Sequence, residues 1–182
     1  MNDFFAIICK GQADADILRS LLPEYVALEA RFLVSHNKSS GVSKARTVLL
    51  DPHSTVLVVE DSDTFNSGMI EERYDFILAA LSLVSSAERF DAHIFVPEIE
   101  AIFFQDADFL ALCGKPLNET ELKAAQRAPK ETLRELGLTA DVIRQAGAQG
   151  AKLLRESPMI QELLARIRRL GVSQDSETVQ GA

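Results

Sequence analysis

The sequence predicts a doubly wound α/β fold, with a mostly parallel four-stranded sheet and an all-helical C-terminal part. In its first half, short apolar segments with little internal alternation are separated by segments with the 3.6-residue helical period. Strands that are apolar on both sides and separated by helices are typical of a parallel sheet covered on both faces. Beyond Pro97 the sequence shows helical patterns only.

The expected elements alternate up to Pro97. Strands are predicted over residues 4–9, 30–34, 55–59 and 92–96, and the helices between them over 14–22, 42–50 and 69–86. The segment Ser39–Gly41 is interpreted as a break before the second helix. That helix is expected to stop before Asp51 and Pro52, because a residue preceding proline avoids the α region. The later helices are predicted over residues 99–113, 119–126, 130–137, 140–156 and 158–170.

The chain length favours one domain with a helical extension. With 182 residues, 47% hydrophobic and 25% charged, the composition is average for a globular protein. We assign residues 1–110 to the α/β core, 111–172 to a helical extension packed on it, and 173–182 to a disordered tail, because the tail is polar and lacks an apolar period. The oligomeric state is left open.

The protein is expected to be cytoplasmic and to have no membrane contact. No basic leader precedes Phe4, and no apolar run approaches the about 18 residues of a membrane span. The two cysteines, Cys9 and Cys113, lack the spacing of a metal or redox motif. Cys9 is expected to be a buried free thiol at the end of a strand.

Charge is distributed unevenly along the chain. The net charge of −8 argues against a general nucleic-acid binder, but residues 31–46 carry four bases and no acid. Residues 47–75 carry seven acids and one base, and the C-terminal helices end in the basic segment 166–169. Basic residues beside an acidic cluster suit a phosphate-bearing ligand next to a metal ion. Solvated faces of helices and loops explain the same pattern equally well.

Two carboxylates follow the third predicted strand. Asp61 and Asp63 are two residues apart, so on an extended chain they point to the same side with Cα atoms about 6.6 Å apart. Such a pair suits Mg²⁺, which takes oxygen ligands and is often held by one or two carboxylates. The alternative is that both residues cap the loop and the next helix.

Two segments resemble the motifs of the Toprim domain. Cys9–Leu18, with the sequence CKGQADADIL, is similar to the first motif, in which a strand ends in Glu-Gly and an Asp opens the helix. Glu60–Asp63, EDSD, is similar to the second, an Asp-x-Asp after the third strand. The resemblance covers residues 4–105. It implies a fold found in topoisomerases, primases, recombination proteins and nucleases, where the Glu and both Asp residues hold Mg²⁺ for phosphodiester chemistry.

A third segment supports the same resemblance. Pro97–Ala101, PEIEA, together with the later Ser157 and Pro158, is similar to segments of small Toprim-like bacterial proteins. A plainer interpretation places Glu98 and Glu100 in the first turn of a helix, where acids complement the dipole.

The chain departs from the Toprim motif at Lys10, which stands where the family has its catalytic Glu. A charged lysine cannot ligate Mg²⁺. Either Glu98 or Glu100 supplies the missing carboxylate, or Glu60 turns inward. Alternatively, Lys10 takes the metal's electrostatic place in an inactive domain through an ion pair with Asp61 or Asp63. We prefer this last interpretation.

The resemblance and the charges together assign roles to ten residues. Lys10, Glu98 and Glu100 are candidate catalytic residues; Gly11, Lys38, Lys44 and Arg46 are candidate phosphate-binding residues; Asp61, Asp63 and Glu60 are candidate ligands of Mg²⁺, with Mn²⁺ as a substitute.

Three classes of function remain open. The first is a degenerate phosphodiester-processing module in nucleic-acid metabolism or defence, and the second is an active Mg²⁺-dependent nuclease. The third is a non-catalytic module that binds nucleotides or a protein partner such as an ATPase. Unrelated receiver-like or hydrolase-like α/β proteins are disfavoured, because the chain lacks a Gly-rich phosphate loop and a Ser/His/Asp motif.

Overall fold

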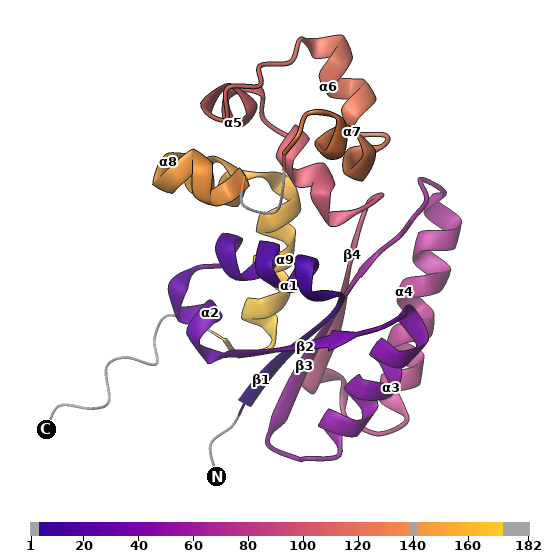
Figure 1. Cartoon of the computed structure of the whole chain (residues 1–182). Coiled ribbons are helices and arrows are strands. Elements are labelled where there is room, and N and C mark those ends of the chain that lie inside the picture. Colours follow the sequence, from indigo (N-terminus) through magenta and orange to yellow (C-terminus); the bar gives the residue numbers. More distant parts are fainter. Residues whose placement is uncertain (1–3, 139–141, 173–182) are drawn as a thin grey trace, which may run out of the picture.

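A four-stranded, all-parallel sheet lies at the centre of the chain (Figure 1). The computed structural model describes residues 4–138 and 142–172. The strand order is β2-β1-β3-β4. The strands are β1 Phe4–Lys10, β2 Ala30–Ser35, β3 Ser54–Asp61 and β4 Phe90–Phe95. The predicted fold class is therefore confirmed, and each predicted strand is present with ends that differ by up to two residues.

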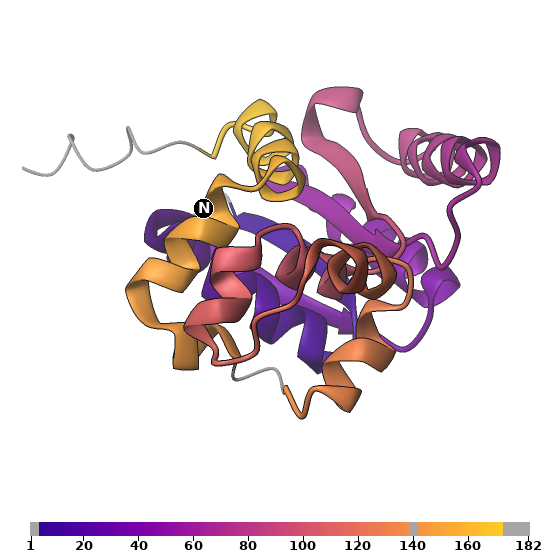
Figure 2. The same ribbon diagram turned by 90° about the horizontal axis from the view of Figure 1, so that it is seen from above.

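Helices cover both faces of the sheet. Figure 1 shows α3 and α4 on one side and α1 and α9 on the other. Seen from above in Figure 2, the helices from α5 to α8 lie over one end of the sheet. The helices are α1 Gln12–Leu21, α2 Glu24–Glu29, α3 Lys38–Leu49, α4 Ser67–Ser82, α5 Ala107–Leu112, α6 Glu119–Ala125, α7 Pro129–Glu135, α8 Val142–Glu156 and α9 Pro158–Arg169, with the 3₁₀ turns η1 Ala87–Arg89 and η2 Ile99–Phe104.

The prediction of a break at Ser39–Gly41 is wrong, because α3 begins at Lys38. Asn37 caps this helix: its side-chain oxygen accepts a hydrogen bond from the Ser40 N–H at 2.8 Å, and Ser40 Oγ accepts one from the Asn37 N–H at 3.1 Å. Gly41 stays helical for a packing reason. A Cβ there would lie 3.2 Å from Ser35 Oγ, so glycine lets α3 approach the end of β2 closely.

Other differences concern single elements. Helix α2 lies between α1 and β2, where no helix is predicted. The helix expected over 99–113 is divided into η2 and α5, and Asp106 caps α5 by accepting a hydrogen bond from the Asp108 N–H. Helix α8 is kinked at Gly147. The tail predicted to be disordered, 173–182, lies outside the described residues.

The C-terminal helices share an apolar core with the sheet. Leu163 and Ile167 of α9 are buried in the same cluster as Ile7 of β1 and Leu57 of β3. Phe103 and Phe109, which connect the sheet to the later helices, are fully buried. Helix α9 therefore completes one face of the sheet.

Two further expectations concern the cysteines and the membrane. Both cysteines are free thiols, and Cys9 is buried as predicted. Within residues 4–138 and 142–172, no helix has the length and apolar character that crossing a bilayer requires.

Truncation of Leu163 tests whether α9 belongs to the same cooperative unit as the sheet. Because Leu163 is fully buried, we expect Leu163→Ala to lower the free energy of unfolding by about 2–5 kcal/mol. Urea unfolding followed by circular dichroism should show one transition. The exposed Arg168 on the same helix supplies the control, since Arg168→Ala should change stability by less than about 0.5 kcal/mol. Two separate transitions would contradict this account.

Candidate active-site edge and its lysine

The candidate site lies where the strand order reverses, between β1 and β3. In open α/β sheets, ligands bind at the carboxyl ends of the strands at such a reversal. Lys10 ends β1, Asp61 ends β3, and Asp14 lies in the first turn of α1. Gly11, with φ at 92°, turns the chain from β1 into α1. The structure thus brings both predicted motifs to one edge of the sheet.

Asp61 is the buried carboxylate of this edge, with 3% of its surface exposed. Its Oδ1 accepts a hydrogen bond from the Ile99 N–H at 2.8 Å. The segments that follow β3 and β4 are also joined by backbone bonds, from the Ser62 N–H to the Phe95 carbonyl and from the Asp63 N–H to the Pro97 carbonyl. Asp61 therefore has a fixed orientation toward η2.

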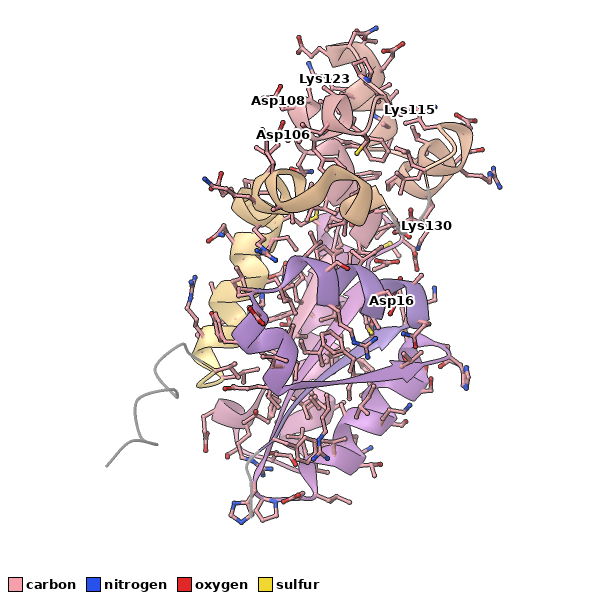
Figure 3. The ribbon with its side chains drawn as sticks, turned by 60° about the vertical axis from the view of Figure 1, so that its left-hand side comes forward. Asp16, Asp106, Asp108, Lys115, Lys123 and Lys130 are labelled. Carbon is pink, nitrogen blue, oxygen red and sulfur yellow. The ribbon has the colours of Figure 1, made fainter. Side chains whose placement is uncertain are left out.

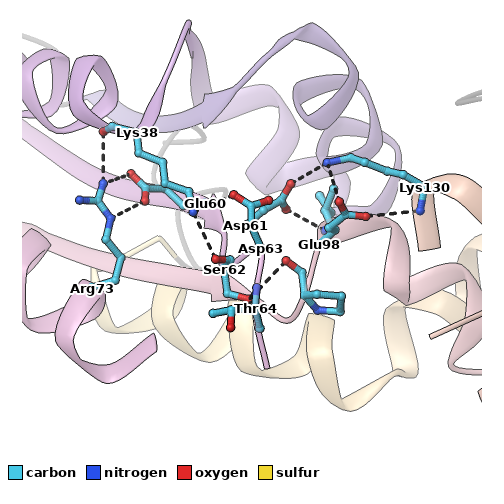
Figure 4. Close-up of polar contacts among 11 residues, drawn as sticks. Lys38, Glu60, Asp61, Ser62, Asp63, Thr64, Arg73, Glu98 and Lys130 are labelled. Carbon is cyan, nitrogen blue, oxygen red and sulfur yellow. Dashed lines mark hydrogen bonds and ion pairs between the residues drawn. The ribbon is translucent and has the colours of Figure 1, made fainter. Parts of the chain in front are cut away.

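A lysine from the C-terminal helices reaches this carboxylate. Lys130 Nζ, from the first turn of α7, donates to Asp61 Oδ2 at 2.9 Å (Figure 4). The same nitrogen lies 3.6 Å from Glu98 Oε1 and 3.6 Å from Glu100 Oε2. The Lys130 backbone N–H donates to Glu98 Oε2 at 3.3 Å. One ammonium group thus faces three carboxylates, and we call these four residues the Lys130 cluster.

The charge of Lys130 is strongly favoured. Burial lowers the pKa of this amine, but the hydrogen bond to Asp61 and the attraction of Asp61, Glu100 and Glu98 outweigh burial and raise the pKa above its usual value. The side chain is nevertheless 44% exposed.

Two carboxyl groups at this edge are harder to ionise than usual. Burial raises the pKa of Glu100 to about 7, with Lys130 opposing the shift and Asp61 and Asp14 adding to it. Burial and the repulsion of Asp61 raise the pKa of Asp14 to about 6, against the attraction of Lys130 and Lys10. At this edge, burial and repulsion between the carboxylates therefore outweigh the attraction of the lysines.

The predicted grouping of Glu60 with Asp61 and Asp63 is wrong. Side chains alternate along a strand, so Glu60 points to the opposite face from Asp61. There its side chain is 4% exposed and accepts two hydrogen bonds from Arg73, at 2.8 and 2.7 Å. Asp63 has φ at 56°, so the chain is no longer extended, and its carboxylate pairs with Lys38 Nζ at 2.9 Å.

The ion pair expected between Lys10 and Asp61 or Asp63 is also replaced, by the pairs of two other lysines. Among the described residues, Lys130 pairs with Asp61 and Lys38 pairs with Asp63, and no ion pair joins Lys10 to either carboxylate. Lys10 lies at an even-numbered position of β1, on the same face as Ile8, whereas Asp61 points to the other face. Lys10 remains an exposed cation at the end of β1.

The four candidate phosphate-binding residues do not form one group. Lys38 contacts Asp63 and the Ser62 carbonyl, and Lys44 Nζ donates to the Val34 carbonyl. Arg46 is exposed eight residues beyond Lys38 on α3, about 12 Å along the helix axis and away from the strand ends. The Gly11 N–H donates to the Ser35 carbonyl. Of the three basic candidates, Lys38 is therefore the one whose side chain contacts the segment after β3.

The carboxylates of this edge could hold Mg²⁺ only if the Lys130 ammonium group moved away from Asp61. Among residues 4–138 and 142–172, no group of three or more carboxylate, histidine or cysteine side chains is arranged to hold a metal ion. Both oxygens of Asp61 are already used, one by the Ile99 N–H and one by Lys130. A divalent cation at Asp61 would have to replace the ammonium group.

The basic segment at the end of α9 contributes to the fold. Arg166 Nη1 lies 3.2 Å from Asp91 Oδ1, and Arg169 pairs with the other oxygen of Asp91. Tyr74 of α4 donates to Asp91 Oδ1 at 3.0 Å. This network attaches α9 and α4 to the edge strand β4.

No family model, curated protein or solved structure matches this chain. The Toprim resemblance therefore remains a prediction from the sequence. Sequence reasoning also does not single out Lys130, for which the only signal is a position at the start of a helix after Pro129.

Loss of Arg73 should destabilise the protein strongly. Arg73→Met leaves the carboxylate of Glu60 buried without its partner, and we expect a loss of about 3 kcal/mol in the free energy of unfolding. The exposed pair Lys123–Glu119 gives the control, since Lys123→Met should cost less than about 0.5 kcal/mol. Equal effects of the two substitutions, measured by urea unfolding, would show that the Glu60–Arg73 pair is not buried in solution.

Glu100 should make stability depend on pH. Its pKa of about 7 exceeds the ordinary value of about 4.3, so the folded chain binds this proton more tightly than the unfolded chain. The free energy of unfolding should therefore fall as the pH rises from about 4.3 to above 7. In Glu100→Gln this contribution is absent, so the variant should gain stability relative to the parent between pH 5 and 8.5, measured by thermal melts.

Comparison of the two curves removes the contributions that both proteins share, among them that of Asp14, whose raised pKa of about 6 acts in the same direction as that of Glu100. His93, whose pKa burial lowers to about 4, makes a contribution of opposite sign below about pH 6.5, but in both proteins. The exposed Glu119 gives the matched control, Glu119→Gln. Parallel pH curves for Glu100→Gln and the parent would contradict the assignment.

Proposed function

We propose that this chain is a non-catalytic, Toprim-like module that binds phosphodiester groups, with Lys130 in the place where an active relative would hold Mg²⁺. The observation that carries the proposal is the position of the Lys130 ammonium group among Asp61, Glu98 and Glu100 at the strand reversal. An ammonium group has no vacant coordination site, so it can neutralise carboxylates but cannot polarise a phosphate or activate a water as a metal ion does.

The surroundings of the cluster suit a phosphate-bearing ligand. Lys10 is an exposed cation at the end of β1, and Lys38 forms an ion pair with Asp63 after the end of β3. The Lys130 side chain is itself about half exposed. These three amines border the same carboxyl edge, where a polyanion would meet Lys10 directly and would meet Lys38 and Lys130 beside their paired carboxylates.

An active Mg²⁺-dependent nuclease is the second candidate. It is favoured by the exposure of Lys130, which leaves the side chain free to withdraw, and by the raised pKa values of Asp14 and Glu100. These raised values indicate carboxylates that a divalent cation would stabilise in their ionised form. In that case Asp61, with Glu98 or Glu100, would hold the ion.

The proposal also includes the cellular location of the protein and its partners. We expect a cytoplasmic protein that binds nucleic acid and acts together with a protein partner such as an ATPase.

Substitution of Lys130 separates the two candidates. Lys130→Met keeps the apolar stem and removes the charge. We expect the parent chain to show no Mg²⁺ or Mn²⁺ binding at millimolar concentration by calorimetry, and Lys130→Met to bind either ion with a rise in melting temperature. The combination Lys130→Met/Asp61→Asn should lose this binding, and Lys123→Met on α6 should behave as the parent.

A parent chain that binds Mg²⁺ and cleaves single- or double-stranded substrates would contradict the proposal and favour the nuclease. Phosphodiester binding is measured separately, with a single-stranded oligonucleotide and no divalent ion at low salt. Lys10→Ala and Lys130→Met should each weaken it, and binding that neither substitution changes would contradict the proposed site.

A further inference from the structure

Helix α4 has apolar side chains on two faces. Ile77 and Leu81 on its inner face are buried against the sheet. Met69, Phe76 and Leu83 recur every seven residues on a second face, within about 40° of one another around the helix axis. They are 58%, 55% and 75% exposed, and we call them the α4 stripe. Helices with apolar side chains beyond a single face are normally covered on both, so the stripe indicates an interaction surface.

The α4 stripe is long and lies at the side of the molecule. Figures 1 and 2 place α4 at this side, and no described helix or strand lies beyond it. The stripe extends about 21 Å along the helix. At about 200 Å² for a large side chain, its exposed surface amounts to about 400 Å². This is about half of the roughly 800 Å² that one partner contributes to an interface of standard size, and the apolar share of such interfaces is similar.

A hollow of about 330 Å³ lies along the first half of α4. The residues of α4 that line it are Met69, Glu72, Arg73 and Phe76. Their spacing, i, i+3, i+4 and i+7, is that of the four residues that enclose one side chain of a facing helix. The Phe76 ring is held in place, because the Arg73 guanidinium carbon lies 5.2 Å from its centre and Arg73 donates two hydrogen bonds to Glu60. The hollow is therefore preformed for an apolar side chain from another helix.

The charges of α4 suit an antiparallel pair of two such helices. Glu71, Glu72 and Asp75 are exposed in its first half, whereas residues 76–87 carry no charged side chain. In a parallel pair, the acids of one helix would face the acids of the other and repel them. In an antiparallel pair, the acidic half of each helix lies over the uncharged half of the other, and the helix dipoles are opposed. The charge pattern therefore favours the antiparallel arrangement.

We propose that two copies of this chain associate through α4, as a two-fold symmetric, antiparallel helix pair. Helix α4 carries both halves of the contact, the hollow along its first half and the protruding Leu83 at its end. In a pair centred between Phe76 and Ala79, Leu83 of each copy lies opposite Glu72 of the other and enters its hollow. A two-fold interface requires such a self-complementary surface. The interface includes no residue of the Lys130 cluster, so it is independent of the proposed function.

Two other parts of the chain fit this role less well. Residues 173–182 carry two acids and no base, so as a covering segment they would add like charge beside the acids of α4. At the end of the molecule formed by α5 and α6, Figure 3 shows Asp108, Lys115 and Lys123, all of them exposed. Charged side chains are depleted at the centres of interfaces. The α4 stripe is therefore the favoured surface for a second copy.

Sedimentation velocity of the full chain tests the proposal. We expect a dimer at micromolar to submillimolar concentration. Phe76→Asp should weaken association at least about thirtyfold, because it replaces the central ring of the interface by a charge. Leu28→Asp on α2 is the matched control: Leu28 is 77% exposed, but α2 packs on the other face of the sheet, so association should not change. Circular dichroism checks that both variants keep the helix content of the parent.

Two substitutions at one position test the orientation of the pair. Because antiparallel pairing brings residue 83 opposite Glu72 of the other copy, Leu83→Asp should weaken association at least about tenfold more than Leu83→Lys. A parallel pair brings residue 83 opposite its own counterpart, where two aspartates and two lysines repel alike. Leu83 is exposed at the end of α4, so both variants leave the buried core unchanged.

Three results would overturn the inference. The first is a parent chain that stays monomeric at submillimolar concentration, which would leave the α4 stripe to a different protein or to a terminal segment of this chain. The second is a dimer that Phe76→Asp and Leu83→Asp leave unchanged, since two copies would then meet through another surface. The third is an equal effect of Leu83→Asp and Leu83→Lys, which would exclude the antiparallel pair.

Discussion

The ion pair between Lys130 and Asp61 is the interaction on which the carboxyl edge of this protein depends. Asp61 is almost fully buried, and one of its oxygens is held by the Ile99 N–H. A carboxylate in that position is costly without a cation, because burial disfavours its charge. Lys130 supplies the cation and at the same time joins α7 to the end of β3. This one contact therefore shapes the electrostatics of the edge and holds the start of α7 against the end of β3.

The ion pairs on the two faces of β3 follow from the alternation of side-chain directions along a strand. Glu60 and Asp61 are neighbours in sequence but pair with different cations, Arg73 on one face and Lys130 on the other. Both pairs bring distant segments to the end of the same strand. The result is an acidic strand end that the fold neutralises internally with Arg73, Lys38 and Lys130, while Lys10 stays exposed at the end of β1.

The sequence predicts the fold well because apolar periodicity is local. Strand β1, strand β3 and helix α9 are all found within one or two residues of their expected ends. The sequence also brings Lys10, Asp61 and Glu98 to one edge, since carboxyl ends of parallel strands meet there. It cannot identify the pairing cation, because Lys130 is 69 residues from Asp61 and only tertiary packing makes them neighbours. Nor does it predict the left-handed conformation of Asp63, which ends the extended geometry.

The most direct test of this account is a crystal structure of the parent chain grown with Mn²⁺, examined for anomalous scattering at the end of β3. We expect the Lys130 Nζ atom within hydrogen-bond distance of Asp61 Oδ2 and no anomalous peak in the Lys130 cluster. A Mn²⁺ ion bound at about 2.2 Å from Asp61, with the Lys130 side chain displaced into solvent, would contradict the claim that this lysine takes the place of the metal ion.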